Sequence, residues 1–217
     1  MRVASTPRTA ALLAFGLLLS IVIGACGALG PTATPNPVCP AGDVRAAKTL
    51  PRLEALLPLG MIERSPTTLD SGWNCSAAAL GTYVAHGVSK LDFAGATWDD
   101  GNGNGVVTAI LALDSGPLDV AWVEEFYTAG AVAGKHTGNV KTDRPTYAGA
   151  GQVFRLETIN DLSLQTVVIW PSAPYVHVVI VATTVSPDAV RADHDQRLQI
   201  AVEVAAAVPV PTVVVLQ

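Results

Sequence analysis

The sequence predicts an α+β fold: a single domain with an antiparallel sheet and helices packed mainly on one face of that sheet. Half of the residues are apolar and only 14% are charged, which is typical of a globular chain and not of a disordered one. Several β-rich runs are joined by short turns, which predicts antiparallel pairing. Amphipathic runs that begin at capping residues predict helices that cover the sheet.

The first 25 residues predict a signal peptide and not part of the fold. Arg2 and Arg8 give the chain a positive start, and an uncharged apolar run follows from residue 10 to residue 25. The run is shorter than a typical membrane-spanning helix, which favours a cleaved secretory segment over an uncleaved N-terminal membrane helix.

The apolar run ends in the residues Ile23-Gly24-Ala25-Cys26, which resemble the lipobox of bacterial lipoproteins. The resemblance covers residues 1–26 only. It implies that Cys26 becomes the lipid-modified first residue of the mature chain. It also implies that acyl chains hold the protein to a membrane of the bacterial cell envelope, outside the cytoplasm.

Four segments are expected along the chain. Residues 1–25 are the signal peptide, and residues 26–38 are the lipidated cysteine followed by a tether rich in Pro, Thr and Ala. Residues 39–208 form the extracytoplasmic α+β domain, which is long enough for a sizeable core. Residues 209–217 are a C-terminal tail with two prolines.

The first half of the domain predicts two short helices and a pair of strands. Pro51 fits the first turn of a helix within residues 50–60. Ser76 can cap a second helix that Gly87 ends. Residues 90–98 and 105–113 are two β-rich runs on either side of a glycine-rich stretch.

The second half predicts a helix, a loop and a three-stranded meander. Asp119 can cap an amphipathic helix over residues 118–134, and a loop is expected up to residue 151. The strands of the meander are expected at residues 152–159, 162–170 and 175–184.

The last expected element is the clearest helix, over residues 186–208. Ser186 can cap it and Pro187 fits its first position. A late helix that packs across a meander resembles the domains of small secreted lipoproteins of the PsbP or Mog1 type. This is an analogy of fold and implies no function.

The net charge bears on the class of partner, and the cysteines bear on the presence of a disulfide. Without Arg2 and Arg8 the mature chain has 11 basic and 18 acidic residues, a net charge of −7, which disfavours nucleic acid as a partner. With Cys26 lipidated, Cys39 and Cys75 remain as a pair in an oxidising compartment, and we expect a disulfide between them. The alternative is two buried free thiols.

The stretch from Trp98 to Val107 resembles the front half of a calcium loop, with Asp100, Asn102 and Asn104 as the weak candidate ligands. A loop of this kind needs a bidentate carboxylate at its twelfth position, where this chain has Leu111. Alternating Asn and Gly between two strands is instead typical of a hairpin turn. We therefore expect a hairpin and no metal.

No catalytic motif is present: the sequence lacks G-x-S-x-G, H-E-x-x-H and a Walker loop. We therefore expect no cofactor and a noncatalytic binding or accessory lipoprotein, whose ligand or protein partner the sequence does not name. One alternative is a structural or assembly subunit of an envelope complex. The other is an enzyme with an unrecognised site, for which a pocket would have to gather at least two of five side chains: His86, His136, His177, Asp99 and Asp143.

Overall fold

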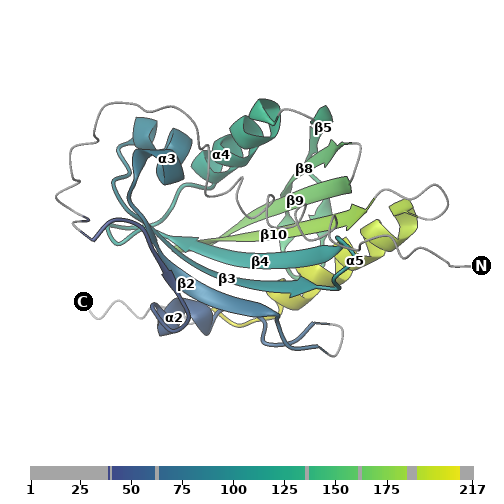
Figure 1. The fold of residues 1–217 in the computed structure, drawn as a ribbon, viewed down its shortest axis with the longest axis horizontal. Coiled ribbons are helices and arrows are strands. Elements are labelled where there is room, and N and C mark those ends of the chain that lie inside the picture. Colours follow the sequence, from purple (N-terminus) through teal and green to yellow (C-terminus); the bar gives the residue numbers. More distant parts are fainter. Residues whose placement is uncertain are drawn as a thin grey trace, which may run out of the picture.

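The computed structural model of the protein describes residues 39, 41–61, 64–134, 137–160, 163–184 and 190–210. Its main element is an eight-stranded antiparallel sheet in the order β1-β2-β3-β4-β10-β9-β8-β5 (Figure 1). The strands are β1 (Val44–Ala46), β2 (Thr68–Asn74), β3 (Leu91–Asp99), β4 (Gly105–Ala112), β5 (Gly138–Asp143), β8 (Phe154–Ile159), β9 (Ser163–Ser172) and β10 (Tyr175–Thr184). Strands β6 (Thr146–Tyr147) and β7 (Gly151–Gln152) form a separate ladder. The predicted antiparallel sheet is confirmed.

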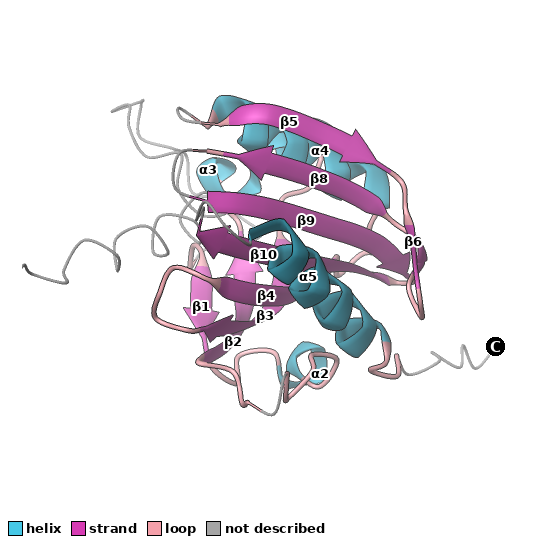
Figure 2. Cartoon of the chain, turned by 90° about the vertical axis from the view of Figure 1, so that its right-hand side faces the viewer, coloured by secondary structure: helices cyan, strands magenta, loops and turns pink. Residues whose placement is uncertain are grey.

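Helices lie on both faces of the sheet, and not mainly on one face as the sequence had led us to expect. The helices are α2 (Pro51–Glu54), α3 (Ala77–Leu80), the 3-10 helix η1 (Gly81–His86), α4 (Val120–Ala133) and α5 (Val190–Ala206). Helix α5 contacts β10, β4 and β9 on one face, where α2 contacts β2 and β3. Helix α4 contacts β8 and β9 on the opposite face and packs against η1. Figure 2 shows α5 in front of the sheet and α4 behind it.

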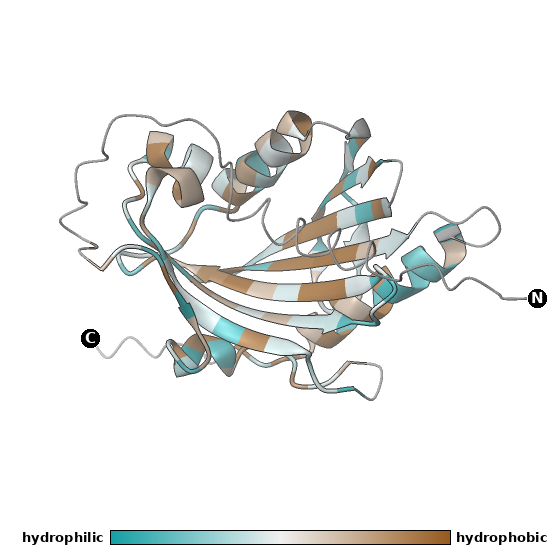
Figure 3. Ribbon diagram, viewed as in Figure 1, coloured by the Kyte–Doolittle hydropathy of each residue, from teal (hydrophilic) through white to brown (hydrophobic). Residues whose placement is uncertain are grey.

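Two faces need covering because the central strands are apolar on both sides. In β9, Val168 and Trp170 belong to the core on the α5 side, whereas Ile169 between them belongs to the core on the α4 side. Figure 3 shows this hydrophobic band along β9, β10 and β4. A strand that is apolar on successive residues is typical of a sheet buried on both faces. This explains why the sheet lies between two layers of helices.

The predicted hairpin is confirmed. β3 and β4 pair antiparallel from Asp92↔Ala112 to Asp99↔Gly105. The meander β8-β9-β10 is also confirmed, and β10 pairs with β4, so that the hairpin and the meander share one sheet.

Helix caps follow the sequence closely. The Ser76 side chain accepts a hydrogen bond from the Ala79 N–H (3.2 Å), and the Asp119 side chain accepts one from the Ala121 N–H (2.9 Å). Gly81 has φ of +51° and divides the expected single helix into α3 and η1. Such a φ favours glycine, and a Cβ there would lie 3.0 Å from the Phe126 ring.

Several elements differ from expectation or lie outside the described residues. The expected loop up to residue 151 contains β5, β6 and the start of β7, and the strands β1 and β2 were not predicted. The expected cap Ser186 and Pro187 lie outside the described residues, as do Cys26 and the tether. Within the described ranges, no helix has the length and hydrophobicity that crossing a bilayer requires.

Candidate functional site

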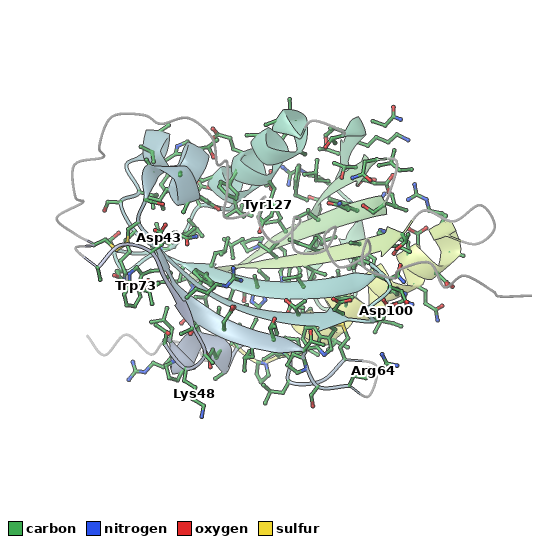
Figure 4. The ribbon with its side chains drawn as sticks, in the orientation of Figure 1. Asp43, Lys48, Arg64, Trp73, Asp100 and Tyr127 are labelled. Atoms are coloured by element: carbon green, nitrogen blue, oxygen red, sulfur yellow. A yellow bond between two sulfur atoms is a disulfide. The ribbon has the colours of Figure 1, made fainter. Side chains whose placement is uncertain are left out.

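The β3–β4 turn contains Asp100, Asn102 and Asn104. Figure 4 labels Asp100 at this end of the sheet. Oδ1 of Asp100 accepts the backbone N–H groups of Asn102 (2.8 Å) and Asn104 (3.3 Å), and Oδ2 accepts the side-chain amide of Asn104 (2.8 Å). Burial alone would raise the pKa of Asp100, but these hydrogen bonds hold it below its ordinary value.

The same turn is fastened to the end of β10. The Thr184 N–H donates to the side-chain oxygen of Asn104 (2.9 Å), and the Thr184 hydroxyl donates to the Asn102 carbonyl (2.9 Å). The described part of the chain contains no group of three or more His, Cys, Asp or Glu side chains placed to hold a metal ion. The polar atoms of the turn are thus hydrogen-bonded within the turn and to β10. The lack of calcium binding stays a prediction.

The disulfide lies at the opposite end of the sheet. The Cα atoms of Cys39 and Cys75 are 6.0 Å apart, which fits a disulfide, so the predicted pairing is confirmed. Beside it, Asp43 accepts the N–H groups of Cys75 (2.6 Å) and Ser76 (2.8 Å). Burial favours a higher pKa for Asp43, but these bonds and that of the Ser76 hydroxyl lower it.

His194 is completely buried between α5 and the sheet. Its Nε2 lies 2.8 Å from the Thr166 hydroxyl on β9, and its Nδ1 lies 2.9 Å from the Thr183 hydroxyl on β10. Burial lowers the pKa of His194 to about 4, so the ring is neutral at pH 7. Both ring nitrogens have a threonine hydroxyl as hydrogen-bond partner, so this histidine links α5 to β9 and β10.

His177 is also buried, on the same face of the sheet as α2 and α5. Its ring stacks on Trp170 of the neighbouring strand, with the ring centroids 5.0 Å apart. Burial lowers the pKa of His177 to about 4, and its Nε2 has no hydrogen-bond partner. A buried ring nitrogen without a partner is costly, and this residue is the least satisfied of the described histidines.

The other described candidate side chains for an enzyme site lie on different elements of the fold. His86 pairs with Glu125 (2.7 Å) and stacks on Trp122, both on α4. Asp99 accepts the Gly101 N–H in the β3–β4 turn, and Asp143 on β5 pairs with Arg155. His136 lies outside the described residues.

A hollow of about 500 Å³ is present where α2 meets the sheet. Residues 49–53 form its wall, and Asp92, Ala112 and Tyr175 form its floor. The floor residues come from the adjacent strands β3, β4 and β10. The lining surface is almost entirely apolar, and its volume falls within the range of small-molecule sites. It contains none of the described candidates for an enzyme site.

A small charged cluster borders the hollow. Lys90 Nζ lies 2.8 Å from Asp92 Oδ1 and 2.7 Å from Asp114 Oδ2, and it stands over the Trp73 ring at 5.3 Å. Burial raises the pKa of Asp92, with a further contribution from Asp114, while Lys90 acts against the rise. The Lys90 ammonium group is thus already paired with Asp92, the carboxylate in the floor of the hollow.

Comparison with known proteins found no matching family model, no matching curated protein and no matching solved structure.

Sequence reasoning missed the hollow. Its wall comes from the segment around Pro51, and its floor comes from strands whose order depends on the distant pairing of β4 with β10. The alternation of β4 makes Ala112 a small inward residue, but the sequence does not reveal which side chains stand beside it.

Proposed function

We propose that this protein is a lipid-anchored lipoprotein of the bacterial cell envelope whose extracytoplasmic domain is a noncatalytic binding module. Lipidation of Cys26 would hold it to the membrane, and residues 26–38 would act as the tether. The binding role rests on one observation, the apolar hollow beside α2.

The use of the described titratable groups supports a noncatalytic role. His194 is engaged by two threonine hydroxyls, and His86 is engaged by Glu125 and Trp122. A general base needs access to a substrate, and the completely buried His194 does not have that access.

The distribution of exposed apolar side chains favours a binding module over a subunit of an envelope complex. The large apolar residues that are exposed in the described part of the chain are Leu59, Val84, Val132 and Ile159. They belong to four different elements or loops, and single apolar residues of this kind are normal on a protein surface. A docking subunit needs a contiguous patch.

Replacing Cys26 by serine tests the anchor. We expect Cys26→Ser to abolish incorporation of labelled fatty acid and to release the domain or leave an unprocessed precursor, because serine offers no thiol for lipid attachment. The measurements are metabolic labelling with a fatty acid and fractionation of the membranes.

The chain provides a matched control in its other two cysteines. The double variant Cys39→Ser and Cys75→Ser keeps Cys26 and should be labelled as strongly as the unaltered protein. Full labelling of Cys26→Ser, or loss of label per molecule of protein in the double variant, would refute lipidation at this residue.

A further inference from the structure

One small side chain, that of Ala112, lies in the floor of the hollow beside α2. Ala112 pairs with Asp92 across β3 and β4, and Tyr175 directly precedes Val176, which pairs with Leu111. The floor is therefore a row of three side chains of which only the middle one is small. A bulky side chain at position 112 would fill the space between Asp92 and Tyr175.

The lining selects an apolar ligand body. Leu50 and Leu53 stand in the wall, and Leu53 also belongs to the core on this face. The carboxylate of Asp92 is the charged group of the floor, but its Oδ1 is already paired with Lys90. A cationic ligand would have to compete with that ammonium group, so the floor does not favour a cation.

The wall also contains an unused positive charge. Arg52 is exposed, and no described side chain forms an ion pair with it. Four other arginines each pair with a carboxylate: Arg45, Arg144, Arg155 and Arg191. An arginine can cover an apolar surface with its methylene groups while its guanidinium stays at the rim. There the guanidinium can bind a carboxylate, sulfonate or phosphate with two parallel hydrogen bonds.

We infer that the hollow binds a small anionic amphiphile, whose apolar body lies on Ala112 between Leu53 and Tyr175 and whose single anionic group meets Arg52 at the rim. This inference rests on the proposed binding role and specifies its ligand class. It uses charge complementarity at the rim and apolar complementarity at the floor, the two features that a ligand of this class requires.

Two fluorescent probes of the same shape test the inference. Anilinonaphthalene sulfonate has an aromatic body and one sulfonate, and N-phenylnaphthylamine has the same body without the charge. Titrations use the mature chain without its acyl groups, residues 27–217, which retains every described residue. They are made well below the unfolding temperature and with near-UV circular dichroism as a check of folding, because the sulfonate dye also binds molten globules.

We expect one saturable site for both dyes. Ala112→Leu should remove the binding of both dyes, because the added side chain fills the floor. Arg52→Ala should weaken binding of the sulfonate dye roughly tenfold, as expected for loss of one charge-assisted contact, and leave binding of the neutral dye unchanged. Lys141→Ala removes an exposed charge from the opposite edge of the sheet and should change neither affinity.

Ala109→Leu is the matched control for the floor, because residue 109 lies in the same strand on the opposite face. Dye binding that persists in Ala112→Leu and is lost in Ala109→Leu would place the ligand on the α4 side. That outcome would overturn this inference while leaving a binding role intact. No saturable binding of either dye would overturn the site itself, and equal weakening by Arg52→Ala and Lys141→Ala would overturn the role of Arg52.

Discussion

Acidification from about pH 6.5 to about pH 4 is expected to lower the free energy of unfolding by about 3 kcal/mol for each of two buried histidines, His177 and His194. An unfolded histidine has a pKa near 6.5, whereas burial lowers the pKa of both folded side chains to about 4. The unfolded chain therefore binds more protons than the folded chain in this window. The stability that the neutral rings contribute is complete above pH 6.5 and is lost as the pH falls toward 4.

Other shifted groups act in a different window or with the opposite sign. The pKa values of Asp43, Asp100, Asp114 and Glu157 are lowered, so these carboxylates cost stability only when the pH falls below their ordinary values near 4. The pKa of Asp92 is raised, so its protonation favours the folded state on acidification. The loss between pH 6.5 and pH 4 is thus dominated by the two histidines.

Urea unfolding at a series of pH values measures this loss, and two variants divide it. His177→Phe keeps a ring that can stack on Trp170, and His194→Gln keeps polar atoms that can reach Thr166 and Thr183. Each variant should remove about half of the pH dependence in this window. A flat pH profile of the unaltered protein, or an unchanged slope in both variants, would contradict the assignment.

Removal of the Cys39–Cys75 disulfide is expected to cost roughly 4 kcal/mol, because the cross-link restricts the unfolded chain between two cysteines 36 residues apart. The double variant Cys39→Ala and Cys75→Ala should show this loss as a lower midpoint in urea unfolding at neutral pH. The hydrogen bonds that the Asp43 side chain accepts come from the backbone N–H groups of residues 75 and 76, so they remain available in the variant.

Reduction of the unaltered protein provides an independent control for the same bond. Dithiothreitol should lower the midpoint by the same amount in the unaltered protein and have no effect on the double variant. A midpoint that neither treatment changes would mean that the bond contributes nothing to stability.

The elements that the sequence predicted are those whose signals are local. The hairpin follows from Asn and Gly between two β-rich runs, and the helix starts follow from the side chains of Ser76 and Asp119. Each signal depends on residues within one turn or one pair of strands, which a sequence displays directly.

The features that the sequence did not predict depend on tertiary pairing. Strand β5 contains Gly138, Asn139 and Asp143, residues typical of turns, and is a strand because it pairs with β8 at the sheet edge. Helices on both faces follow from β9 and β10 being apolar on successive residues, a pattern that a single strand shares with a buried helix segment. The hollow requires the order of β3, β4 and β10, which only the distant pairing of β10 with β4 establishes.

The most direct test of the proposed binding role is mass spectrometry of the molecules that remain bound to the mature protein. The protein and its Ala112→Leu variant would be purified in parallel from bacterial membranes in a non-ionic detergent, and their bound molecules would be extracted and compared in negative-ion mode. The account predicts an anionic amphiphile that is enriched with the unaltered protein and depleted from the variant, because residue 112 forms the floor of the hollow. Identical extracts from the two proteins would contradict it.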